Sequence, residues 1–172
     1  MPIKIITMIK PVKLEQEVVD LLLPRLKMEL THFYFYRAAS NWCQGVGYFK
    51  AAEYFAKESE EESGHAKEIE KYLTDWNVFP ALPTIDQPII MFSSLPTLIE
   101  AAYNTEYDLY TQYEEASMQI FDIGDLCTFD FLQVYRKRQK DSVASLSDMI
   151  NLLEGVNENS KFELLMLEEK LF

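Results

Sequence analysis

Cysteine and glycine are scarce in this chain of 172 residues. The two cysteines, Cys43 and Cys127, have no ligand spacing and do not form the disulfide framework of a small secreted protein. We therefore expect a reducing compartment and a cytoplasmic location. Only five glycines accompany long stretches in which apolar residues recur with a helical period. This combination predicts an all-α fold.

Basic residues are also in deficit. Sixteen lysines and arginines oppose 28 aspartates and glutamates, which gives a formal net charge of −12 at pH 7. Binding to a phosphate backbone requires a basic surface, so we expect no nucleic-acid partner. The negative charge is compatible with collecting cations, although plain solubility explains it equally well.

Long hydrophobic runs are missing as well. The partly apolar residues Met1–Lys10 lack a small-residue cleavage site and a sufficient apolar run, so we expect no signal peptide and no membrane association. Hydrophobic residues still make up 48% of the chain and aromatic residues 13%, which is enough for a packed interior. The length fits a single domain over residues 1–172.

The helical period is sustained in four long segments, which predict the helices of a bundle. They lie at about residues 12–41, 47–75, 94–121 and 126–153, after a tail at 1–11 and before a short fifth helix at 157–172. Short connections at 40–47 and 122–125 indicate that the helices they join are antiparallel neighbours. Pro24 lies inside the first segment and either kinks that helix or divides it.

Residues 76–93 have no helical period and contain Pro80, Pro83 and Pro88. Eighteen extended residues reach at most about 60 Å, whereas the preceding helix is about 42 Å long. This crossover loop can therefore run the full length of the bundle and make the third helix parallel to the second. The prediction is an up-down-down-up four-helix bundle over residues 12–155. The short fifth helix has apolar residues that it cannot bury alone, so it needs a groove or another subunit.

Each long segment places a polar residue in an otherwise apolar stripe. In the second segment, Glu62-Ser63-Gly64-His65 is a Glu-x-x-His pattern, whose carboxylate and imidazole share one face of a helix. The other three stripes contain Glu29, Glu106 and Gln139. We place Glu29 in a stripe formed by Leu22, Leu26, Phe33 and Tyr36. Singly, such residues are common on helix surfaces or in cores, but together they predict a metal site inside the bundle.

The predicted ligands indicate the chemistry of the site. Three buried carboxylates repel one another unless a cation joins them. Three carboxylates, an imidazole and an amide suit two divalent ions bridged by a carboxylate. Oxygen and imidazole ligands without thiolate favour iron or manganese and also accept zinc. Tyr36 lies seven residues after Glu29, on the same face, as a redox or hydrogen-bonding partner.

A second Glu-x-x-His pattern runs from Glu29 to His32. Bundle sites with two such patterns carry one on each of two helices, and the second belongs on the last core helix. That helix has Arg136-Lys-Arg138-Gln139-Lys-Asp141 instead. We therefore leave His32 out of the predicted ligand set.

Several segments together resemble a bacterial non-haem ferritin, over roughly residues 12–155. They are Met28-Glu-Leu-Thr, Tyr36, Ser40-Asn-Trp-Cys43, Glu60-Glu-Glu-Ser-Gly-His65, Tyr103-Asn-Thr-Glu106 and Phe129-Asp-Phe-Leu-Gln-Val-Tyr135. The resemblance implies a ferritin-like fold and a ferroxidase centre. One iron position takes Glu29, Glu62 and His65, and the other takes Glu62 as a bridge and Glu106, with Gln139 close by and Tyr36 as the nearby tyrosine.

The resemblance also implies iron storage and detoxification in a hollow cage of 24 identical subunits. Such a cage oxidises Fe(II) with dioxygen or peroxide and deposits a ferric mineral, and the short fifth helices cluster around its four-fold axes. Two alternatives remain. One is a ferritin-like di-iron oxidase that acts on another substrate and stores nothing, and the other is a bundle whose acidic residues are merely structural.

Two departures from the family pattern concern additional sites. Bacterial ferritins often hold a third iron between acidic residues, for which Glu61 and Asp141 remain as accessory ligands. Arg138 and Ser142 stand at positions that are usually acidic, so we expect the third site to be lost, with Arg138 paired to Glu61 or Asp141. Ser63 stands where haem-binding bacterioferritins carry methionine, so we expect no haem.

Overall fold

The computed structural model describes residues 13–172. The predicted tail at 1–11 and the predicted helix start at Val12 lie outside this range. Within it the chain forms five helices and no strand, which confirms the all-α prediction. Their bounds are α1 Gln16–Val46, α2 Phe49–Asp75, α3 Leu95–Ile123, α4 Leu126–Leu153 and α5 Lys161–Leu171.

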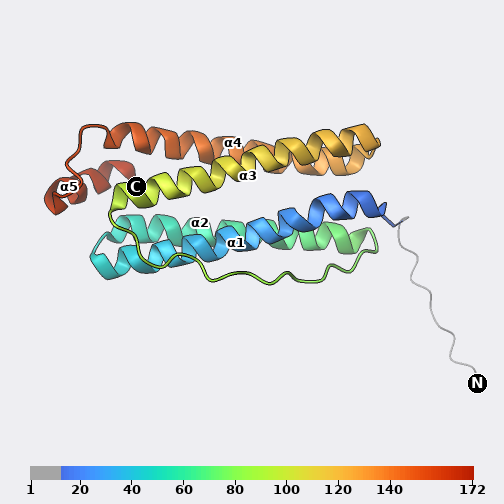
Figure 1. Cartoon of the computed structure of the whole chain (residues 1–172), viewed down its shortest axis with the longest axis horizontal. Coiled ribbons are helices and arrows are strands. Elements are labelled where there is room, and N and C mark those ends of the chain that lie inside the picture. Colours follow the sequence, from blue (N-terminus) through green and yellow to red (C-terminus); the bar gives the residue numbers. More distant parts are fainter. Residues whose placement is uncertain (1–12) are drawn as a thin grey trace, which may run out of the picture.

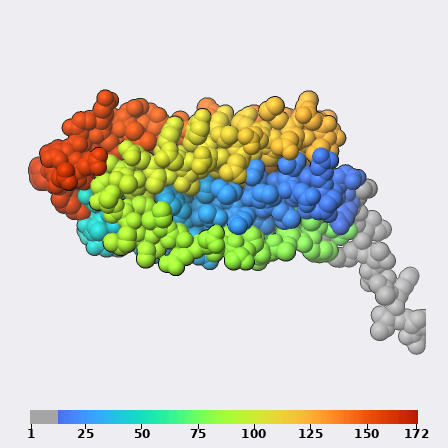
Figure 2. All heavy atoms as spheres, viewed as in Figure 1, coloured from blue at the N-terminus to red at the C-terminus, as the bar shows by residue number. Residues whose placement is uncertain are grey.

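The four long helices form the predicted up-down-down-up bundle (Figure 1). A tight turn returns α2 antiparallel to α1, and a second tight turn returns α4 antiparallel to α3. The crossover, residues 76–94, runs along the length of the bundle, so that α3 starts at the same end as α2. The space-filling view shows the crossover lying along the surface beside α1 (Figure 2). Ser94 then caps α3, because its side-chain oxygen accepts the Thr97 N–H at 3.2 Å.

The first helix differs from the prediction at its C-terminal end. It continues through residues 40–46, which the sequence analysis assigned to a connection, and it is one helix through Pro24. Trp42 and Cys43 are buried, so the last turns of α1 contribute to the core. The helix ends at Gly47, whose backbone is left-handed with φ 87° and whose N–H donates to the Cys43 carbonyl at 3.0 Å. Only Gly47 and Tyr48 connect α1 to α2.

The bundle interior consists of two apolar clusters at opposite ends with a polar layer between them. One cluster includes Tyr36, Phe55, Leu98 and Leu146, and the other includes Leu22, Ile69, Leu109 and Leu132. Every long helix passes from one cluster to the other through buried polar side chains. We call these side chains the polar layer: Glu29 and His32 on α1, Ser59 and Glu62 on α2, Glu106 on α3 and Gln139 on α4.

The fifth helix packs against the four-helix bundle of the same chain, at the end where α1 joins α2. Leu164 and Leu171 are buried in the apolar cluster at that end. Glu168 accepts the Ala51 N–H at 2.9 Å, which satisfies a free donor in the first turn of α2. Lys161 donates to the Val46 carbonyl at 2.6 Å at the end of α1. The opposite face of α5 remains exposed, with Phe162, Leu165 and Met166.

Candidate metal centre

Glu62 lies at the middle of the polar layer and belongs to two sets of metal-ligating side chains. In each set, one ligand atom from every member lies within 4.8 Å of the others. The first set is Glu29, Glu62 and His65, and the second set is His32, Glu62 and Glu106. A carboxylate shared between two such sets is the arrangement that bridges a pair of cations.

The imidazoles lie beside the carboxylates at both positions. His65 Nδ1 is 3.3 Å from Glu29 Oε2 and 3.4 Å from Glu62 Oε2. On the other side of Glu62, His32 Nδ1 is 3.7 Å from Glu106 Oε1. His65 retains a little exposed surface, whereas His32 has none. The structure thus adds His32, which the sequence analysis left out, to the residues that surround Glu62.

Two buried tyrosines hold the outer carboxylates. Tyr36 donates to Glu106 Oε1, and Tyr113 donates to Glu29 Oε1. Burial and the neighbouring carboxylates raise the pKa of both tyrosines well above the ordinary value, so both stay protonated as donors. Tyr113 was not predicted from the sequence, although it stands seven residues after Glu106 as Tyr36 stands seven residues after Glu29. That repeated spacing on two helices was the available signal.

Several atoms of the polar layer have no hydrogen-bond partner within residues 13–172. They are Glu29 Oε2, Glu106 Oε2, Gln139 Oε1 and both ring nitrogens of His32. Leaving a buried donor or acceptor unpaired costs about 1–3 kcal/mol. The tyrosines satisfy one oxygen of each outer carboxylate and leave the other oxygen free. Free oxygen and nitrogen atoms that converge on a buried point are a good fit for divalent cations.

The electrostatics of the centre also favour a cation. Burial and the adjacent Glu29 carboxylate raise the pKa of Glu62 well above its usual range. Burial acts on Glu29 in the same direction, but the neighbouring His65, Glu62 and Tyr113 side chains stabilise its charged form and lower its pKa. These opposite shifts favour the protonated form of Glu62 and the charged form of Glu29. Nearby on α2, burial and the Glu61 and Glu106 charges raise the pKa of Glu58 to about 7. A bound cation would relieve this repulsion and displace the proton.

Comparison with protein families matches residues 19–156 to the ferritin-like domain. The chain belongs to the ferritin family. It is 27% identical over 140 residues to the bacterial non-heme ferritin of Escherichia coli O6:H1. The aligned region covers 81% of this chain and 85% of the relative. It is also 27% identical over 146 residues to the bacterial non-heme ferritin of Campylobacter jejuni. That alignment covers 85% of this chain and 87% of the relative.

A solved structure supports the same fold. The open pore ferritin from the archaeon Archaeoglobus fulgidus superposes with a TM-score of 0.86 at 22% identity, covering 92% of this chain and 96% of the archaeal one. The four long helices of this chain enclose the polar layer. Among residues 13–172, no helix is both long and apolar enough to cross a membrane.

In this ferritin, Arg138 does not pair as the sequence predicted. Its guanidinium donates to Glu68 at 2.7 Å and lies 5.5 Å from the centre of the Tyr135 ring. Glu68 lies on α2, seven residues after Glu61. It offers two oxygens to the planar guanidinium, a geometry that favours arginine. The expected partners are exposed or half-exposed and bond elsewhere, Glu61 to Lys57 at 3.2 Å and Asp141 to Lys140 at 3.4 Å.

Gln139, the last of the predicted ligands, is buried in the polar layer.

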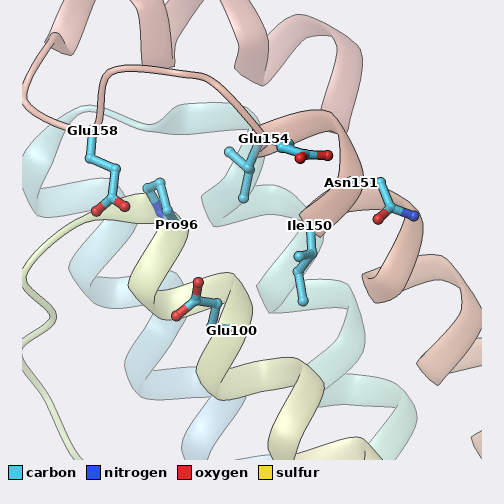
Figure 3. Close-up of a pocket in the computed structure, with 7 residues that line it drawn as sticks. Pro96, Glu100, Ile150, Asn151, Glu154 and Glu158 are labelled. Atoms are coloured by element: carbon cyan, nitrogen blue, oxygen red, sulfur yellow. The ribbon is translucent and has the colours of Figure 1, made fainter.

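A separate cluster of carboxylates lies in a pocket of about 360 Å³ at the α5 end of the bundle (Figure 3). Its carboxylates, Glu100, Glu154 and Glu158, are all exposed, and no histidine lines the pocket. Solvent therefore screens these charges, and the structure gives no reason to place the centre there.

Proposed function

We propose that this chain stores iron by oxidising Fe(II) at the centre around Glu62 and depositing ferric mineral inside a cytoplasmic cage of 24 subunits. Membership of the ferritin family supports iron storage in general terms. The observation that carries the ferroxidase step is the set of buried ligand atoms that have no partner among the described residues 13–172. Two Fe(II) ions, the substrate, would satisfy them.

The residues have distinct roles in this proposal. Glu29, Glu62 and His65 hold one Fe(II), and Glu62 bridges to a second Fe(II) that is held by Glu106, with Gln139 close by. Tyr36 orients Glu106. Each Fe(II) gives one electron, and dioxygen takes two electrons and two protons to become hydrogen peroxide. When peroxide is the oxidant, two electrons and two protons convert it to two waters. Haem is not part of the proposal, because Ser63 offers no thioether ligand.

Size and iron loading together test the proposal. We expect the purified protein to sediment as a particle of about 24 times the 20.1 kDa subunit mass. Fe(II) added in air should oxidise faster than in buffer, and ferric iron should co-sediment with that particle. A monomer or dimer that oxidises iron without retaining it would instead indicate an oxidase of the same fold. A protein that neither binds nor oxidises iron would indicate a purely structural bundle.

We further propose that Arg138 prevents a third iron site. An arginine is always charged and cannot bind a metal ion. The pair with Glu68 holds its positive charge beside the Tyr135 ring, whose hydroxyl donates to the His65 carbonyl at 3.2 Å.

Crystals soaked in Fe(II) provide the test of this third-site proposal. Anomalous data at the iron edge should show two strong peaks per subunit in the parent and a third, near Glu61 and Asp141, in Arg138→Glu. Lys137→Glu makes the same charge change at an exposed position and should keep two peaks. A well-occupied third peak in the parent would overturn the proposal.

A further inference from the structure

Two polar-layer side chains have no role in the proposed centre: Ser59, whose hydroxyl donates to the Phe33 carbonyl at 3.2 Å, and His32. His32 is completely buried, and neither ring nitrogen has a hydrogen-bond partner in the described part of the chain. A neutral imidazole carries one donor and one acceptor, and burying both unpaired is costly. Glu106 Oε1 lies 3.7 Å from His32 Nδ1, which is beyond hydrogen-bond distance. A structural histidine in a core is normally satisfied, so this one calls for another partner.

The surroundings of His32 identify that partner. Its ligand atom lies within 4.8 Å of ligand atoms from Glu62 and Glu106. Tyr36 already occupies Glu106 Oε1, while Glu106 Oε2 has no partner within residues 13–172. The free carboxylate oxygen, the shared Glu62 and the free imidazole therefore converge on one point.

We propose that His32 is a ligand of the second iron position. This inference rests on the proposed function and specifies its second site. Each position then has the same donor set, one outer carboxylate, one imidazole and the shared Glu62. The outer carboxylates are Glu29 and Glu106, and each has its tyrosine. Imidazole is a stronger ligand for borderline divalent ions than a side-chain amide, so His32 rather than Gln139 is the main neutral ligand of the second ion.

A surface pocket reaches the same side chain. The pocket, about 260 Å³, lies between α1, the crossover and α3, and His32 is among its lining residues. Asp86 and Asp108, both exposed, also line it. The two carboxylates give this pocket negative charge, which favours the approach of a cation on the side of the bundle where His32 lies.

Anaerobic titration of the metal-free, full-length protein with Co(II) tests the inference without iron oxidation. The parent should bind two ions per subunit. His32→Leu and His65→Leu form a matched pair, in which each removes one imidazole and keeps a side chain of similar bulk. Each should bind one ion. Crystals soaked in Co(II) should show which one is lost: His32→Leu keeps the anomalous peak between Glu29, Glu62 and His65, and His65→Leu keeps the other.

A folding readout separates a ligand from a structural residue. Metal-free His32→Leu should melt at or above the parent temperature, because it removes two unpaired buried polar atoms. Co(II) should then stabilise the parent more than the variant. If the leucine variant does not fold, His32→Gln should weaken the second position at least about tenfold.

The outcomes distinguish this inference from the proposed function. A parent that binds no ion contradicts both. A parent that binds two ions, with a His32→Leu variant that also binds two at the parental affinity, contradicts only the role of His32. The role of His32 is also contradicted if the second anomalous Co(II) peak in parent crystals lies beyond bonding distance of both His32 nitrogens.

Discussion

Glu62→Ala is expected to empty both metal positions and to slow Fe(II) oxidation by at least about 100-fold. Glu62 is the only member common to the two sets of ligands found in the described residues, so its loss removes a donor from each. His65→Ala should remove only the position next to Glu29 and leave one ion bound. Binding is measured by anaerobic titration, and oxidation by the initial rate of ferric absorbance after Fe(II) is added in air.

Glu61→Ala is the matched control for this prediction. Glu61 is the adjacent glutamate on the same helix, but it is about half exposed and pairs with Lys57. Its removal should leave two ions bound. Metal-free Glu62→Ala should not unfold more easily than the parent, because the raised pKa of Glu62 shows that the buried carboxyl is unfavourable when charged. Parental oxidation rates in both Glu62→Ala and His65→Ala would show that the centre lies elsewhere.

Leu164→Ala is expected to lower the free energy of unfolding of the subunit by about 2–4 kcal/mol. Leu164 is only 2% exposed and belongs to the apolar cluster at the α5 end of the bundle. Phe162→Ala, on the opposite face of α5 where the ring is 74% exposed, should leave subunit stability unchanged. In the proposed cage the exposed face of α5 contacts other subunits, so Phe162→Ala should weaken assembly while subunit stability stays unchanged.

Two measurements separate the faces of α5. Chemical denaturation monitored by circular dichroism reports subunit stability, and sedimentation velocity reports the size of the assembly. Met166→Ala, also on the exposed face, is a second assembly variant that should follow Phe162→Ala. Equal stability of Leu164→Ala and Phe162→Ala would mean that α5 does not dock on its own bundle in solution.

The sequence predicted the bundle well where polar residues interrupt a clear apolar stripe. On α2, α3 and α4, Glu62, Glu106 and Gln139 are buried between apolar neighbours as expected. The crossover was predictable because eighteen extended residues are long enough to span the length of α2 and because residues 76–93 have no helical period.

The first helix was harder to predict because it is apolar around most of its circumference. A helical period counted from Leu22 and Glu29 falls between His32 and Phe33, so spacing alone cannot decide which of them faces inward. The structure buries His32 and leaves Phe33 half-buried. Local signals also misled at the C-terminal end, where Gly45 suggested a loop although the chain stays helical to Val46. The docking of α5 depends on tertiary contacts, which no local pattern encodes.

The polar layer also fixes how far each helix is advanced along its neighbours. Two apolar helices can slide past each other by one turn, about 5.4 Å, with little change in the apolar area that they bury. Here such a slip would move Glu29 away from Tyr113 and His65 and press its carboxylate against leucines. The cost of an unpaired buried charge rules out that alignment. The groups that suit the centre to cations therefore also select one longitudinal register for the bundle.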